Sequence, residues 1–282
     1  MKRNADIGFF TNPSIVDTPF IQHPESNPMS LRRFYMPPEM VQLPQPEISG
    51  SDAGHIYRVL RLSAGDAVEL FDGIGNGYRA QIVSASPMRV RFRIEKTFPL
   101  LSESSVHITL AQGILKDRKM DNLIRQLTEL GIDCWMPFYA ARSVPVPVEK
   151  GMQKRLGRWE KIALEAVKQC RRGRVPCIRP ADNFEAMLAT SDEFDLKIIF
   201  WEGAPQAFDI PETTPPSPEN IMVVVGPEGG FDPGEVQLAK THGFLTIGLG
   251  PRILRAETAT LAACTLVQYR FGDMGPGILT MS

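Results

Sequence analysis

Residues 221–240 have the sequence IMVVVGPEGGFDPGEVQLAK, and this stretch decides the fold. Its first five residues are all apolar, which is typical of a strand buried on both faces of a parallel sheet. Asp232 is placed as a helix N-cap, with Pro233 at the first helical position and Glu235 three residues after the cap. The stretch therefore predicts a buried strand, a glycine-rich turn at 226–230 and a following helix. In open α/β sheets ligands bind at such strand ends.

Strands and helices alternate on both sides of that stretch, from about residue 101 onward. Apolar runs separated by amphipathic segments predict an α/β domain with a mostly parallel sheet and helices on both faces. In the helical segment 117–131, apolar side chains recur at helical spacing and Gly131 is placed as a C-terminal cap. Further strands are expected at 107–115, 132–138, 197–201 and 244–250, and a further helix at 154–170.

Residues 30–100 are predicted to form a separate, small β-rich domain. It follows a flexible N-terminal extension at 1–29, which is rich in polar and turn residues. The stretch FDGIGNGY (71–78) carries a GxGxG pattern, which also occurs in dinucleotide-binding loops. Such a loop must lead into the N-terminus of a helix, whereas this one leads into a second strand. A hairpin turn is therefore favoured.

Two more segments of the small domain have one apolar side each. In MRVRFRIEK (88–96), apolar residues alternate with arginines, which predicts a strand with one apolar and one basic face. A short helix is expected at 52–62, packed against the same small core. The apolar side of that helix is expected to carry Ile56, Val59 and Leu60.

The composition narrows the class of protein. The 282 residues carry a net charge of −1 and are 43% hydrophobic, as in an ordinary folded protein. There is no run of about 18 apolar residues and no secretory leader, so no membrane association is expected. The histidines are scattered and the four cysteines form no CxxC pair, so no metal is expected. Reduced thiols in the cytoplasm are the natural interpretation.

Two further turns follow apolar strands. The strand FLTIGLG (244–250) leads directly into PRILR, and FWEG (200–203) ends another strand. Because the carboxyl ends of parallel strands meet at one edge of a sheet, these turns and the glycine-rich turn together predict a ligand pocket. Each turn alone would also suit a plain tight turn. Arg252 and Arg255 are either ligand contacts or ordinary surface cations.

The segments GPEGGFD (226–232) and LGPRILRAETA (249–259) resemble the hallmark segments of the bacterial 16S rRNA uridine N3-methyltransferases. Further similar segments lie at 55–66, 116–132 and 158–176. This resemblance implies an α/β fold with a C-terminal SPOUT-type domain at 101–282, which contains a deep trefoil knot, and a PUA-like RNA-binding β-barrel at 30–100. It also implies S-adenosyl-L-methionine as cofactor, the 16S rRNA of the small ribosomal subunit as substrate, and a homodimer.

The resemblance also suggests roles for individual residues. N3 of uridine carries a proton, and a guanidinium within hydrogen-bonding distance would favour the anion formed by its loss. Arg255 is the first choice for this role and Arg252 the second. Glu257 or Glu228 would take the proton or orient the arginine, or Glu257 simply begins a helix. Cofactor contacts are expected from Phe200, Trp201, Glu202, Gly226, Pro227, Glu228, Gly229, Gly230, Leu249, Gly250, Pro251, Arg252, Ile253 and Leu254.

Basic residues indicate where RNA would bind. The segment 142–174 has ten lysines and arginines against three glutamates, which fits either RNA contacts or a solvated helix face. Contacts with RNA phosphates are expected from Arg32, Arg33, Arg91, Arg142, Arg171 and Arg172. Two alternatives stay open on the sequence alone. One is a methyltransferase of the same fold with a different RNA target, and the other is an RNA-binding assembly factor that holds the cofactor without turning it over.

Overall fold

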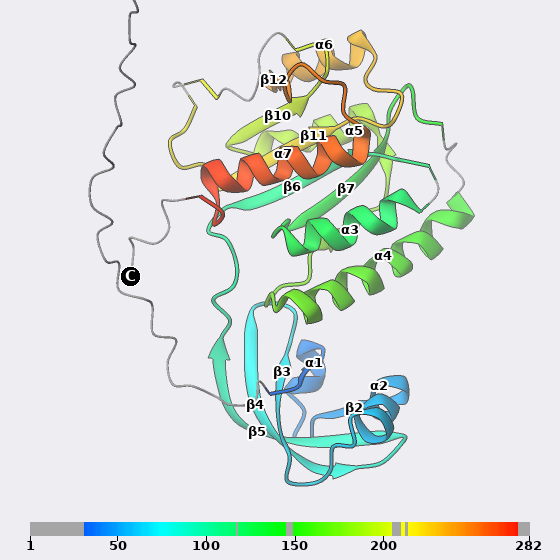
Figure 1. The fold of residues 1–282 in the computed structure, drawn as a ribbon, viewed down its shortest axis with the longest axis vertical. Helices are drawn as coiled ribbons and strands as arrows, with labels where there is room; N and C mark the ends of the chain where they lie inside the picture. Colours follow the sequence, from blue (N-terminus) through cyan, green and yellow to red (C-terminus); the bar gives the residue numbers. More distant parts are fainter. Residues whose placement is uncertain (1–30, 117, 145–148, 205–209, 212–213, 276–282) are drawn as a thin grey trace, which may run out of the picture. The chain divides into compact units, whose positions relative to one another are not determined.

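The computed structural model describes residues 31–116, 118–144, 149–204, 210–211 and 214–275 (Figure 1). The flexible extension expected at 1–29 lies outside the described residues. The described chain contains two sheets, a smaller one in its first third and a larger one in the remainder.

The larger sheet has seven strands in the described part of the chain, and all of its pairs are parallel. The strand order is β12-β10-β11-β6-β7-β8, and β9 also pairs with β7. The predicted parallel α/β sheet is confirmed. Its strands are β6 (His107–Gly113), β7 (Cys134–Tyr139), β8 (Cys177–Ile178), β9 (Asp182–Asn183), β10 (Leu196–Phe200), β11 (Asn220–Val225) and β12 (Leu245–Ile247).

Helices cover both faces of this sheet. The central strand β11 alternates its side chains between two cores, because successive residues of a strand point to opposite faces. Val223 lies in the core with α3, α4 and α7, whereas Val224 lies in the core with α5 and α6. Figure 1 shows α3, α4 and α7 together on one side of the sheet. The helices are α3 (Lys119–Glu129), α4 (Glu149–Cys170), α5 (Phe184–Ala189), α6 (Pro233–Thr241), α7 (Ala256–Phe271) and the 3₁₀ turn Ser191–Glu193.

The smaller sheet has the order β1-β3-β4-β5-β2. The hairpin predicted at 71–78 is confirmed, because β3 and β4 are antiparallel and joined by a short turn. Register shifts between β4 and β5 mark β-bulges, which bend long strands and help a small sheet curl around its core. Its elements are β1 (Arg33–Tyr35), α1 (Pro38–Val41), β2 (Glu47–Ser49), α2 (Gly50–Gly54), the π-helix His55–Val59, β3 (Ala67–Phe71), β4 (Asn76–Ala85) and β5 (Arg89–Pro99).

One prediction for the small domain was wrong. Ile56 is buried as expected, but Val59 is 65% exposed and does not share its apolar side. The reason is that His55–Val59 forms a π-helical turn, whose periodicity differs from that of the α-helix assumed in the prediction.

The carboxylate of Asp72 organises the β3–β4 turn. It accepts hydrogen bonds from the N–H groups of Ile74 and Asn76, from the amide of Asn76 and from the hydroxyl of Tyr78. Burial alone would raise the pKa of Asp72, but these bonds favour the ionised form and hold the pKa below its usual value. The turn is therefore built around a buried, fully satisfied anion.

Tyr78 is expected to make the stability of the protein depend on alkaline pH. Burial, reinforced by the 2.9 Å bond to Asp72, raises the pKa of Tyr78 from 10.0 to about 12. The folded state thus holds the phenolic proton more tightly than the unfolded chain does. The resulting stabilisation is complete below about pH 10 and is lost as pH rises through about 12. Denaturant unfolding across this range should show a steeper loss of stability for the wild type than for Tyr78→Phe, and parallel curves would contradict the bond.

Main-chain pairing joins the segment 171–175, which follows α4, to the β3–β4 turn. Gly75 donates its N–H to the carbonyl of Gly173 at 3.1 Å, and Val175 donates to the carbonyl of Gly73 at 2.9 Å. A Cβ at Gly73 would lie 3.0 Å from the side chain of Val175, so glycine permits this close approach. The segment 171–175 therefore packs against the β3–β4 turn of the smaller sheet.

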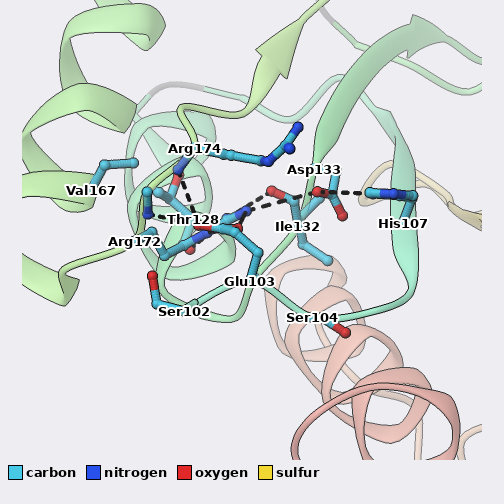
Figure 2. Close-up of polar contacts among 12 residues, drawn as sticks. Ser102, Glu103, Ser104, His107, Thr128, Ile132, Asp133, Val167, Arg172 and Arg174 are labelled. Carbon is cyan, nitrogen blue, oxygen red and sulfur yellow. Dashed lines mark hydrogen bonds and ion pairs between the residues drawn. The ribbon is translucent and has the colours of Figure 1, made fainter. Parts of the chain in front are cut away.

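A buried ion pair fixes the same segment from the other side. The guanidinium of Arg172 donates two hydrogen bonds to Glu103, at 3.0 Å and 2.7 Å. It also donates to the carbonyls of Thr128 and Ile132, at 3.0 Å and 2.9 Å. Figure 2 shows Glu103 and Arg172 facing each other, with these carbonyls beside them. Each of the three guanidinium nitrogens of Arg172 thus donates a hydrogen bond to an acceptor within the protein.

Candidate active site

Three strand-end turns enclose a cavity of about 750 Å³. They follow β10, β11 and β12, which are neighbours in the sheet, and the cavity lies where their carboxyl ends meet. All fourteen residues expected to contact the cofactor line this cavity, from Phe200–Glu202, Gly226–Gly230 and Leu249–Leu254. Additional lining residues are Lys119, Ala204, Val225, Phe231, Arg255, Ala256 and Ala259.

The glycine-rich turn after β11 is held by a capping box at the start of α6. The side chain of Asp232 accepts a hydrogen bond from Gly234 N–H at 2.9 Å, and the side chain of Glu235 accepts one from Asp232 N–H at 2.9 Å. This is the predicted cap. Gly230 has φ +68°, a left-handed conformation that glycine adopts without strain. The sequence thus fixes both where the turn ends and where the helix begins.

The end of β6 supports that turn from the neighbouring strand. A Cβ at Gly113 would lie 2.5 Å from the backbone nitrogen of Pro227, so only glycine allows the two chains to pack this closely. The fully buried side chain of Gln112 donates to the carbonyl of Gly226 at 3.2 Å and accepts from the hydroxyl of Thr260 at 2.6 Å. Gln112 therefore ties the turn to α7. The prediction missed it, although a glutamine inside an apolar strand is itself a signal.

The turn after β12 presents two arginines to the cavity. Gly250 has φ +89°, and Arg255 has an extended backbone (φ −63°, ψ 150°) as the N-cap residue of α7. Within the described chain, neither the guanidinium of Arg252 nor that of Arg255 has a hydrogen-bonding or ion-pair partner. Both residues are exposed and line the cavity. Two cations are therefore available to a bound molecule.

A third cation of the cavity, Lys119, lies between the carboxylate of Glu228, which also lines the cavity, and that of Glu257 at the start of α7. Its ammonium is 3.1 Å from Glu228 and 3.3 Å from Glu257. The pKa of Glu228 is lowered: burial works against this, but the N–H of Lys116 and the ammonium of Lys119 outweigh it. The same contacts raise the pKa of Lys119, mainly through the hydrogen bond to Glu228. The sequence had suggested that Glu257 or Glu228 takes the proton or orients an arginine, or that Glu257 only begins a helix. The structure pairs both glutamates with Lys119, a residue that the prediction missed.

Four of the six arginines expected to bind RNA carry their side chains at the surface or close to it. Arg32 and Arg171 are exposed. Arg142 is exposed and lies 3.4 Å from Asp232, in the segment that packs on the glycine-rich turn. Arg91 is partly exposed and pairs with a glutamate of β2. These side chains are at least partly accessible to solvent, and their contact with RNA stays a prediction.

The other two arginines point inward, and this corrects the prediction for them. Arg172 is 4% exposed and bonded to Glu103 and to two carbonyls, so it has no free donor for RNA. The side chain of Arg33 is 9% exposed and lies 3.0 Å from Glu69, with its guanidinium 4.1 Å over the ring of Phe71. A buried charge must be paired inside the protein. Both residues therefore have a structural role, in ion pairs with Glu69 and Glu103.

The described residues bring together no group of three or more histidine, cysteine, aspartate or glutamate side chains that could hold a metal ion. Among the described helices, none combines the length and apolar character needed to cross a bilayer.

Comparisons with known proteins agree with this architecture. The model of an RNA methyltransferase domain matches residues 102–268, and that of an RNA methyltransferase PUA domain matches 48–95. The chain is 32% identical to ribosomal RNA small subunit methyltransferase E of Bacillus subtilis over 82% of this chain and 93% of the relative. It is 31% identical to the Buchnera aphidicola protein of the same name, over 80% and 88% of the two chains.

Solved structures give the same result. A methyltransferase from Legionella pneumophila, with bound S-adenosylmethionine, is 30% identical with a TM-score of 0.78, over 87% of this chain and all of the other. Ribosomal RNA small subunit methyltransferase E of Neisseria gonorrhoeae, bound to S-adenosylmethionine, is 29% identical with a TM-score of 0.76, over 86% and 99%. On these matches, the chain belongs to the RNA methyltransferase family that includes ribosomal RNA small subunit methyltransferase E, with a PUA-type domain before the catalytic one.

Proposed function

We propose that this protein transfers a methyl group from S-adenosyl-L-methionine to N3 of a uridine in the 16S rRNA of the small ribosomal subunit. One observation carries this proposal. Two unpaired guanidinium groups, those of Arg252 and Arg255, line the same cavity as the glycine-rich turn. The cavity thus combines a backbone cradle for a nucleoside with fixed positive charge for an anionic acceptor.

The residues of the cavity suit S-adenosylmethionine. A cavity of about 750 Å³ lies in the usual range for cofactor sites. The turns after β11 and β12 can offer backbone N–H and carbonyl groups to the adenine. A Cβ at Gly250 would meet no atom within 4 Å, so there is open space beside this turn. Apolar contact for the ring is available from Phe200, Trp201, Leu249, Ile253 and Ala259.

The acceptor, rather than the methyl donor, is the reactant that the protein must activate. S-adenosylmethionine, when bound, supplies a methyl group on a sulfonium, which is already reactive toward a nucleophile. N3 of uridine is a poor nucleophile until it loses its proton, and the charge left behind spreads over the neighbouring oxygens. The guanidinium of Arg255, with Arg252 beside it, stabilises that charge through paired donors. The residues of the cavity would hold the cofactor, and orienting the acceptor toward it would contribute the rest of the rate enhancement.

One carboxylate of the cavity, that of Glu228, is a weak base. Glu228 and Glu257 both contact the ammonium of Lys119, and the pKa of Glu228 is held below its usual value. A carboxylate stabilised in this way takes up a proton reluctantly. The arginines therefore contribute more to forming the N3 anion than Glu228 does.

We further propose a homodimer with a trefoil knot, located in the cytoplasm where ribosomes are assembled. After the edge strand β12, the chain returns over the sheet to α7, which packs against β11 and α3. A return of this kind toward the middle of the sheet supports a threaded chain. The outer side of α7 carries an exposed aromatic, Tyr269, which supports a role in subunit contact. The boundary between the two domains is placed near residue 100.

A methyl-transfer assay tests the proposed function. Small ribosomal subunits from a strain that lacks this modification are incubated with the protein and radiolabelled S-adenosylmethionine. Incorporation into 16S rRNA is expected, at a uridine where reverse transcription stops because a methyl on N3 blocks base pairing. Incorporation into another RNA, or at another atom, would identify a different target within the same fold. Cofactor binding without incorporation into any ribosomal particle would indicate an assembly factor.

A further inference from the structure

We infer that Lys119 is a positioning residue for methyl transfer, which keeps the two cavity arginines free by holding Glu228 in the cavity wall and Glu257 at the start of α7. This inference rests on the proposed function. It explains an unexpected feature of the site. Arg252 and Arg255 line the cavity together with Glu202 and Glu228, and Glu257 follows Arg255 by two residues, yet no arginine–glutamate pair forms among these described residues. Opposite charges so close together normally pair unless something else satisfies them.

The geometry around Lys119 shows what satisfies Glu228 and Glu257. Its ammonium contacts Glu228 at 3.1 Å and Glu257 at 3.3 Å. The two carboxylate oxygens are therefore separated by at most the sum of these two distances. Glu228 also accepts a hydrogen bond from the N–H of Lys116 at 3.2 Å, and Lys116 lies three residues before Lys119 in the chain. One short stretch of chain thus engages both carboxylates.

The position of Lys119 in α3 argues that it is placed for these contacts. It is the first residue of the helix, where the N–H groups point outward and the helix dipole is positive. A lysine there is unfavourable for the helix itself. The carboxylates compensate for this cost, since they bind the ammonium from outside the helix. Helix stability alone would favour an acidic or small polar residue at this position.

The sequence spacing shows which arginine would be affected without the lysine. Glu257 lies in the first turn of α7, two residues after the N-cap residue Arg255. Without the ammonium, Glu257 is left next to Glu228, and like charges at this separation repel. Arg255 is the cation that Glu257 can reach from the same turn. A pair between them would occupy the guanidinium that we assign to the uridine anion.

Turnover of Lys119→Met tests this inference. We expect kcat to fall about tenfold, a size typical of coupling between charged residues in contact, while the KM for S-adenosylmethionine changes little. Adding Glu257→Gln should restore most of the lost turnover, because an amide no longer competes for Arg255. Lys119→Arg should keep most of the activity, since it retains the cation. The matched control is Lys240→Met, which removes an exposed lysine from α6, away from the cavity.

The outcomes separate the possible errors. Absence of methyl transfer by the wild-type protein would refute the proposed function itself. Normal turnover of Lys119→Met in an active preparation would overturn only the role of the lysine. An equal loss in Lys119→Met and in the double variant would also overturn it, because a purely structural lysine is not rescued by changing Glu257. Thermal unfolding shows whether each variant folds, and Lys119→Gln serves as the test if Lys119→Met does not.

Discussion

Replacing Arg255 with alanine should lower the turnover of methyl transfer by about 10²–10³-fold, the usual cost of removing one group that stabilises charge in a transition state. The guanidinium of Arg255 has no partner within the described protein and lines the cavity, so its interactions are available to the acceptor. Its side chain makes no capping bond to α7, so alanine leaves the helix start intact. Binding of S-adenosylhomocysteine, the demethylated product, should stay within a few-fold of the wild type. Single-turnover rates and calorimetric titration measure the two quantities separately.

Two further variants make that result interpretable. Arg255→Lys keeps the charge but loses the planar pair of donors, so its rate should lie between those of the wild type and the alanine variant. Arg270→Ala removes an exposed arginine from the other end of the same helix and should behave as the wild type does. If Arg255→Ala retained full turnover, the acceptor anion would have to be stabilised elsewhere. A loss confined to cofactor affinity would make Arg255 a binding residue only.

The larger sheet could be predicted because its signals are local. The apolar run before the glycine-rich turn, the Asp232 cap and the later helix start near residue 256 each follow from short-range rules. Parallel strands place their carboxyl ends at one edge, so three predicted turns were enough to predict a pocket. The cavity lined by those turns has the place in the sheet that this rule requires.

The pairing of charges could not be predicted, because it depends on partners far away in the sequence. Lys119 contacts glutamates that follow it by more than a hundred residues. The cluster RRGR at 171–174 gives no indication of which arginine turns inward. Arg172 is the one whose guanidinium bonds the carboxylate of Glu103, which lies 69 residues earlier in the sequence.

The π-helical turn at His55–Val59 was missed for a different reason. Its sequence suits an ordinary amphipathic α-helix, and no local sequence feature indicates the wider π-helical turn. The change of period moves Val59 out to solvent while Ile56 stays buried. Tertiary packing overrides local preference in such short elements, because a few residues contribute little helix stability by themselves.

Replacing Arg172 with methionine should destabilise the protein by about 3–5 kcal/mol, the usual cost of removing one partner from a buried ion pair. The change leaves the carboxylate of Glu103 without its cation. It also removes the side-chain donor of the Ile132 carbonyl and one donor of the Thr128 carbonyl, which keeps the N–H of Gly131. Each buried acceptor without a partner adds to the cost. Denaturant unfolding of the full chain at neutral pH measures the loss, as a lower transition midpoint with little change in its slope.

Arg174→Ala is the matched control for that loss. Arg174 is exposed, belongs to the same basic cluster, and contacts Glu103 through its backbone N–H, which alanine retains. Its removal should change stability by no more than about 0.5 kcal/mol, as for other surface substitutions. Glu103→Gln combined with Arg172→Met should cost less than the sum of the single changes, since each removes the reason for the other's penalty. If Arg172→Met and Arg174→Ala proved equally mild, Arg172 would not be the buried anchor of the segment, and its assignment to RNA binding would have to be restored.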